Sequence, residues 1–185
     1  MSGPHSVIRP TGVERRFGTE EIIVTKTDPR GVIRYANDVF LRVAGYRAEE
    51  VLGRPHNIIR HPDMPRAVFR LLWNEIQAGR EIFAYVLNLA SDGSHYWVLA
   101  HVTPSHDDAG RITGYHSSRR CAQARPVQTL TAVYRTLLDV ERGHAGATEA
   151  ADAGYQALTE LLTEHHLTYS QFVWSLISDR PARAA

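Results

Sequence analysis

Residues 55–65 read Pro55-His56-Asn57-Ile58-Ile59-Arg60-His61-Pro62-Asp63-Met64-Pro65. This stretch holds two histidines, an arginine, an aspartate and three prolines. Prolines restrict the backbone while the polar side chains converge, which is typical of a preformed ligand-site wall and not of a solvent loop. An amphipathic helix pattern follows at once over residues 66–78, and Gly79 is expected to end it.

The segment before this stretch predicts a β-hairpin and two short helices. Residues 21–25 are rich in β-branched side chains, residues 28–31 carry turn signals, and residues 32–35 resume the strand pattern. Asn37 is the expected N-cap of a short helix. One more helical turn is predicted over residues 47–52.

The segment after it predicts three longer strands. Residues 81–90 and 94–104 have strand character and are joined by an Asp-Gly dipeptide, which is a strong hairpin signal. Residues 110–119 form the third run. Five strands with helices gathered between the second and the third predict an α+β domain with an antiparallel sheet over residues 20–120.

Both ends of the chain differ from this central domain. Residues 1–19 are polar and are expected to form a flexible N-terminal arm. Residues 121–185 predict a helical appendage, in which residues 127–141 have a helical apolar pattern and residues 142–146 break the helix. Thr148 is the expected cap of the next helix. We expect this appendage to serve signalling or dimerisation.

Composition narrows the class of protein. Apolar residues make up 43% of the chain and the net charge is +1, with no clustering of Lys and Arg that would suggest a nucleic-acid partner. Cys121 is the only cysteine, which excludes an intrachain disulfide and a cysteine-based metal site. The N-terminus lacks a signal peptide, and no apolar run is long enough to cross a membrane. We therefore expect a cytoplasmic protein.

Several motifs resemble one protein family. They are Tyr35-Ala36-Asn37-Asp38-Val39-Phe40, Gly45-Tyr46, residues 55–65, and Asp92-Gly93-Ser94-His95-Tyr96-Trp97-Val98. Together with the order of elements, they resemble a PAS sensor domain over about residues 20–120. The histidine-rich run is similar to that of the FAD-binding PAS domain of bacterial aerotaxis receptors and of stand-alone PAS subunits in bipartite energy-taxis systems.

The resemblance implies a PAS fold, with a five-stranded antiparallel sheet and short helices on one face, and an FAD site. The residues it places around the cofactor are Asn37, Arg60, His61, Asp63, Trp73, Asn88 and Trp97. One departure concerns the segment around Asn88, which is basic in the receptor pattern and reads Leu-Asn-Leu-Ala here. Basic groups could help to hold the FAD pyrophosphate.

The polar residues of the 55–65 stretch each have a second interpretation. Arg60 could bind a phosphate or a flavin carbonyl, or could pair with Asp63 at the surface. His61 could donate to the flavin edge or simply satisfy backbone groups. Asp63 could orient His61 or Arg60, or could cap the helix that follows. We expect His56 to have a packing role.

The remaining site residues are equally open to a structural interpretation. Trp73 lies on the apolar face of its helix, so it could belong to the core or to the cofactor wall. Asn88 shares a strand face with Val86, where a buried amide needs partners that a flavin edge could provide. Tyr96 and Trp97 are adjacent in a strand, so only one of them can face inward.

The sequence predicts a redox or energy-state sensor that binds FAD and is not an enzyme. No nucleophile–base pair, phosphate loop or complete metal set is found, and the pair His165-His166 has no completing ligand. The 55–65 stretch has no cysteine for the photochemistry of light-sensing flavin PAS domains. The partner is expected to be a chemoreceptor-like or membrane transducer protein in trans, and the protein is expected to form a homodimer.

Two alternatives remain. A PAS scaffold without cofactor would fill its pocket with side chains and use the 127–141 face as an interface. A haem gas sensor would require His56 or His61 as the axial ligand.

Overall fold

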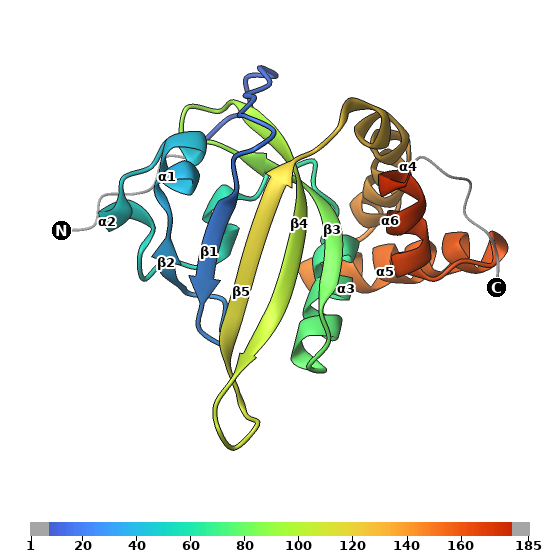
Figure 1. Ribbon diagram of the computed structural model, residues 1–185. Helices are drawn as coiled ribbons and strands as arrows, with labels where there is room; N and C mark the ends of the chain where they lie inside the picture. Colours follow the sequence, from blue (N-terminus) through green and yellow to red (C-terminus); the bar gives the residue numbers. More distant parts are fainter. Residues whose placement is uncertain (1–7, 179–185) are drawn as a thin grey trace.

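A five-stranded antiparallel sheet forms the centre of the protein (Figure 1). The computed structural model describes residues 8–178. The strand order is β2-β1-β5-β4-β3. The strands are β1 (Ile23–Thr27), β2 (Ile33–Ala36), β3 (Ile82–Leu89), β4 (His95–His106) and β5 (Ile112–Cys121). The predicted α+β class and antiparallel sheet are confirmed.

The chain between β2 and β3 covers one face of the sheet. It forms α1 (Asp38–Ala44), α2 (Ala48–Val51), the 3₁₀ helix η1 (His56–Ile59) and α3 (Arg66–Gln77). Asn37 caps α1, because its side-chain oxygen accepts a hydrogen bond from the amide of Phe40. Gly45 ends α1 with a φ of 71°, a left-handed conformation that favours glycine.

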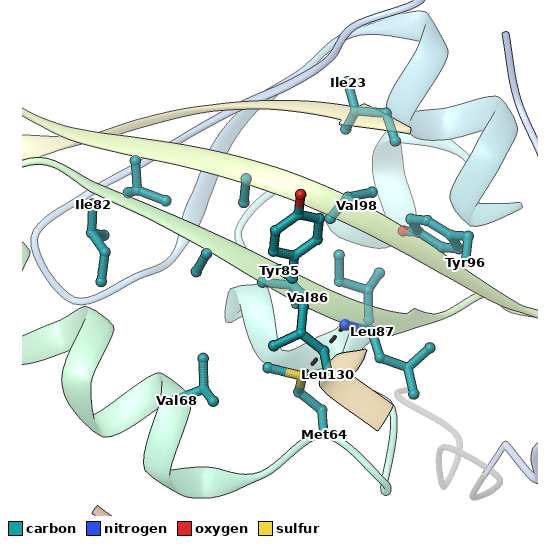
Figure 2. Packing of buried hydrophobic residues seen from close by; sticks show 14 of the residues in the cluster. Ile23, Met64, Val68, Ile82, Tyr85, Val86, Leu87, Tyr96, Val98 and Leu130 are labelled. Carbon is teal, nitrogen blue, oxygen red and sulfur yellow. Dashed lines mark hydrogen bonds between the residues drawn. The ribbon is translucent and has the colours of Figure 1, made fainter. Parts of the chain in front are cut away.

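The 55–65 stretch lies against the edge strand β3. Arg60 and Asn88 form a backbone bridge. The buried sulfur of Met64 accepts the amide of Leu87 at 3.4 Å (Figure 2). An open sheet edge is a site of unwanted strand pairing, and here the proline-bounded segment covers it. The apolar side of α3 then packs under the sheet through Val68 (Figure 2).

The C-terminal extension folds back onto the same edge (Figure 1). It consists of α4 (Ala124–Arg142), α5 (Ala147–Glu164) and α6 (Tyr169–Ile177). The break after Arg142 is confirmed, but the expected cap at Thr148 is wrong, since Gly146 occupies the N-cap position without a side-chain hydrogen bond. Within the described residues, no helix is apolar enough over sufficient length to cross a bilayer.

The apolar face of residues 127–141 packs against other elements of the same chain. Leu130, Tyr134 and Leu137 are buried, and the Tyr134 hydroxyl donates to the carbonyl of Tyr85 at 2.6 Å. The alternative of a scaffold without cofactor used this face as an interface, and these side chains are instead buried within the chain. Helical periodicity shows that a face is buried but does not show which element buries it.

A carboxylate from α4 caps α3. Glu141 is buried, and its two oxygens accept the amides of Arg66 and Ala67 at 2.9 and 2.8 Å. These amides have no partner within the helix, and the positive end of the helix favours a negative charge. Asp63 does not supply the cap that the sequence suggested, because the N-cap residue is Pro65 and the capping group comes from a distant helix.

The described part of the N-terminal segment is attached to the β3–β4 hairpin. The amide of Thr11 donates to the carbonyl of Gly93. The amide of Arg15 donates to the carbonyl of His95, and the amide of His95 donates to the carbonyl of Val13. The Arg15 side chain also pairs with Asp92. Residues 8–19 therefore differ from the expected flexible arm, whereas residues 1–7 lie outside the described residues.

Replacing Glu141 by Gln should destabilise the fold. A Gln side chain offers only one acceptor to the two amides, so we expect a loss of about 1–3 kcal/mol in the free energy of unfolding. Urea denaturation measures the difference. Glu20→Gln, an exposed change of the same type, serves as the control and should alter stability by less than about 0.5 kcal/mol. Equal effects of the two substitutions would contradict the capping role.

Gly154→Ala should also destabilise the protein. A Cβ atom at Gly154 would lie 2.7 Å from Oε1 of Glu141 and 3.2 Å from Cβ of Ala67. Because that carboxylate is held by two amides, the contact cannot relax freely, and we expect a cost of about 1–3 kcal/mol. Thermal unfolding checks this. An unchanged or higher Tm would show that α5 is not packed this closely against α3 and α4.

Candidate functional site

A cavity of about 400 Å³ lies between the sheet and the η1–α3 segment. This volume falls within the range of small-molecule sites. Residues of β1, β3, β4 and β5 form its sheet side, η1 and α3 form the opposite wall, and the first turns of α5 close part of one end. The polar lining residues are Thr25, Thr27, Arg30, His56, Asn57, Arg60, Arg66, Arg70, Asn88, Tyr115, Ser117 and Arg119.

The lining is cationic. Five arginines contribute to it, and no aspartate or glutamate does so among the residues described. Arg30 and Arg70 pair with Asp28 and Asp152, two carboxylates outside the lining. The arginines that remain favour an anionic or electron-rich ligand.

Three of the residues predicted from the sequence line the cavity: Arg60, Trp73 and Asn88. Arg60 donates to the carbonyl of Met64 at 2.9 Å and lies over the ring of Phe69. Trp73 meets Tyr115 edge to face at 5.5 Å. Asn88 is only 3% exposed, on the same face of β3 as Val86. The structure thus brings these three residues together, as the sequence predicted.

Arg119, His56 and Thr25 form a buried polar cluster in the cavity wall. Nη2 of Arg119 lies 2.7 Å from Nε2 of His56 and donates to Oγ1 of Thr25 at 3.0 Å. A guanidinium can only donate, so Nε2 of His56 must accept and its ring proton must be on Nδ1. His56 is thus fixed as a neutral imidazole in one tautomer.

The electrostatics agree with this assignment. Burial, helped by the neighbouring Arg119 charge, holds the pKa of His56 well below 6.5. Burial lowers the pKa of Arg119 to about 10, so the guanidinium stays charged at neutral pH. The wall therefore keeps one positive charge without a carboxylate partner.

Several buried polar atoms have no hydrogen-bond partner in the described structure. Four of them belong to residues that line the cavity: Nε of Arg60, Nδ2 of Asn88, Oγ of Ser117 and Nη1 of Arg119. A buried polar atom without a partner costs about 1–3 kcal/mol. Three of these groups can only donate, and the fourth, a hydroxyl, can donate or accept. A ligand with several acceptor atoms along one edge would satisfy them.

Asn37 has a structural position instead. Its side-chain oxygen accepts the amides of Val24 and Phe40, and its nitrogen donates to the carbonyl of Ile22 at 2.8 Å. These bonds join β1 to α1, and Asn37 is not among the cavity residues.

His61 and Asp63 lie outside the cavity lining. His61 is buried, and its Nδ1 accepts the amide of Asp63 at 3.1 Å. Burial lowers the pKa of His61, and this effect is partly opposed by Asp63. The Asp63 side chain is 62% exposed. Both residues shape the turn that places Arg60, and neither reaches into the cavity.

Trp97 points away from the cavity. It packs against Tyr134 of α4, with ring centroids 5.8 Å apart, on the outer face of the sheet. Tyr96 and Val98, its neighbours on β4, are the buried residues on the inner face. The predicted place of Trp97 in the cofactor site is therefore corrected, and the reason is the parity of the strand, which alternation alone could not decide.

Sequence reasoning missed the cavity residues of β5. Tyr115, Ser117 and Arg119 alternate along a strand whose existence was predicted, so a period of two places them on one face. An arginine on the buried face of a strand was the available signal. His56 was assigned a packing role, and the structure places it in the cavity wall.

Cys121 lies at the end of β5, and its thiol donates weakly to the carbonyl of Ala122. It is not among the residues that line the cavity. The described residues also contain no group of three or more metal-ligating side chains.

Comparison with known proteins bears on the central domain. A model of the PAS fold matches residues 22–118. The chain is 37% identical over 115 residues to the aerotaxis receptor of Escherichia coli (strain K12), covering 62% of this chain and 22% of the receptor. It is 31% identical to a blue-light-activated histidine kinase of Rhizobium johnstonii, covering 57% of this chain and 31% of the kinase. The chain thus spans less than a third of the length of these two relatives.

Two solved structures are similar in fold. The dark structure of the blue-light photoreceptor Aureochrome1 LOV has a TM-score of 0.52 at 27% identity, covering 64% of this chain and 86% of that one. A light-oxygen-voltage domain studied with a flavin analogue has a TM-score of 0.52 at 22% identity, covering 62% and 86% of the two chains. The second likeness concerns the fold alone.

His56 should make stability depend on pH. The unfolded chain binds a proton at His56 near pH 6.5, whereas the folded protein does not, so stability falls as the pH drops below about 6.5. The loss approaches about 1.4 kcal/mol per pH unit. Urea unfolding at pH 7.5 and 5.5, without added flavin, should show a smaller pH effect in His56→Gln than in the unaltered protein. The same pH dependence in both would mean that folding does not lower the pKa of His56.

Proposed function

Because the chain belongs to the PAS fold family, we propose that it is a redox or energy-state sensor that holds FAD in the cavity beneath its sheet and signals to a second protein. The observation that carries this proposal is the set of unpartnered donors on Asn88, Ser117 and Arg119 around one cationic cavity. The similarity to the light-oxygen-voltage domain of a blue-light photoreceptor supports a flavin. The resemblance to the aerotaxis family supports FAD in particular.

The residues present fit a flavin ring. Trp73 and Tyr115 offer aromatic walls, and Val86 and Ile76 add apolar surface. The Asn88 amide can both donate and accept, which matches the alternating polar edge of the ring. Arg119 adds a fixed positive charge. Nε2 of His56 accepts a hydrogen bond from Nη2 of Arg119 and so holds the guanidinium in place.

When bound, a flavin would supply reversible electron uptake, which changes the protonation and charge of its polar edge. Arg119 stays charged in its buried position, so it favours whichever state of a ligand carries more negative charge beside it. Asn88 can exchange a donated for an accepted hydrogen bond by turning its amide. A buried hydrogen bond gained or lost is worth roughly 1–3 kcal/mol, enough to shift a two-state equilibrium about tenfold.

A continuous series of contacts links the cavity to the C-terminal helices. Asn88 is bridged through the backbone to Arg60, whose segment leads directly into α3. The first amides of α3 are held by Glu141 of α4. A change at Asn88 can therefore bias the position of α4 through the 55–65 stretch.

The proposal includes an output in trans. The protein would act as a homodimer in the cytoplasm and signal to a chemoreceptor-like or membrane transducer protein. The relation to an aerotaxis receptor supports this class of partner. A sensor role requires ligand binding and a conformational change, and it requires no catalytic group.

The two alternatives explain the cavity less well. A scaffold without cofactor leaves the donors of Asn88 and Arg119 buried and unsatisfied. A haem would need an axial histidine, but Nε2 of His56 is engaged by Arg119 and Thr25, and His61 lies outside the cavity lining.

The absorption spectrum of the freshly purified protein tests the proposal, recorded before and after reduction with dithionite. We expect the two-banded visible spectrum of an oxidised flavin, which bleaches on reduction, and FAD as the compound released by heat. Asn88→Ala should weaken FAD binding about tenfold or more, because a buried hydrogen bond is lost. Asn74→Ala, an exposed change on α3, should leave the affinity unchanged. A colourless protein that cannot be reconstituted with FAD would refute the proposal.

A further inference from the structure

A second cavity of about 300 Å³ lies where the 55–65 stretch meets the corner between α4 and α5. Arg60 and Arg66 form its wall on the PAS side, and Arg142, His144 and the start of α5 form the other wall. Arg60, Arg66 and Ala147 also line the first cavity, so the two spaces share a wall.

The charge in this corner is unbalanced. Four of the lining residues carry basic side chains, and Glu141 is the one acidic residue among those described there. The Glu141 carboxylate is already engaged by the amides of Arg66 and Ala67. Arg142 pairs only with Asp139 at an exposed position, with 64% of the arginine side chain accessible.

The two arginines of the shared wall differ in their surroundings. Nε of Arg60 is buried without a hydrogen bond, whereas Arg66 is exposed. Burial, followed by the nearby charge of Arg66, lowers the pKa of Arg60, and the charge of Glu141 opposes this shift. Basic side chains gathered around one cavity favour an anionic ligand there.

The start of α5 adds to the same preference. No side-chain hydrogen bond caps α5 at Gly146, Glu149 lies in its first turn, and Ala147 lines both cavities. Helix N-termini with free amides favour phosphate groups. This feature reinforces a site that the cavity and the arginines already define.

We propose that the corner of Arg60, Arg66, Arg142 and His144 is a diphosphate subsite, which holds the pyrophosphate of a dinucleotide whose ring occupies the first cavity. The inference rests on the proposed function and extends it. The receptor pattern has basic residues around Asn88, which this chain lacks, and the α4–α5 corner supplies basic groups from a different direction. Residues 142–147 lie beyond the matched PAS region, so the extension would contribute to the choice of cofactor.

Three flavins distinguish the ring site from the diphosphate site. The dissociation constants of FAD, FMN and riboflavin are measured by flavin fluorescence, using the full chain freed of bound cofactor. We compare the unaltered protein with the double variant Arg66→Gln/Arg142→Gln and with His144→Gln. Arg135→Gln, an exposed change on the same helix α4, is the matched control.

The double variant should bind FAD on the order of tenfold more weakly, as expected for the loss of charge-assisted hydrogen bonds. His144→Gln should give a smaller loss. FMN should be affected less than FAD, and riboflavin should bind as before, which also shows that the variants are folded. The control should bind all three flavins normally.

Two results would overturn the inference. The first is equal affinity of the unaltered protein for FAD and FMN, and the second is an equal loss for all three flavins in the double variant. Failure of the unaltered protein to bind any flavin would instead refute the proposed function itself.

Discussion

The guanidinium of Arg119 is buried in the face of the sheet with no carboxylate among the cavity residues described, and the rest of the site is organised around this charge. It fixes His56 as a neutral acceptor and Thr25 as a second acceptor. One of its donors still has no partner. Such a charge is costly to bury unless a ligand completes its hydrogen bonds, and this is why the cavity is best explained as a binding site and not as a packing defect.

The 55–65 stretch connects this site to the rest of the molecule. On one side it pairs with the edge strand β3 through Arg60 and Met64. On the other it leads into α3, whose first amides are held by Glu141 of α4. The C-terminal extension thus contacts the wall of the cavity directly.

Much of the fold could be predicted because its signals are local. The strand character of residues 81–90 and 94–104 and the Asp-Gly dipeptide between them predicted β3 and β4, and the expected cap at Asn37 predicted the start of α1. The docking of α4 on β3 and the cap from Glu141 could not be predicted, since both depend on contacts between residues distant in sequence. The same holds for the described part of the N-terminal segment, whose polarity predicted a flexible arm.

The site was predictable in part for the same reason. The positions of Arg60, Trp73 and Asn88 follow from motif and strand face, and they line the cavity. Trp97 was misplaced because adjacent strand residues point in opposite directions and the sequence did not decide between them. Arg119 could have been found from its alternation with Ser117 and Tyr115.

A crystal structure of the protein grown with FAD tests the central claim most directly. The account predicts density for a flat three-ring group in the cavity between Trp73 and the sheet, with its polar edge within hydrogen-bonding distance of Asn88 and Arg119. Density for FAD elsewhere on the protein, or a cavity filled by the protein's own side chains while FAD is present, would contradict it.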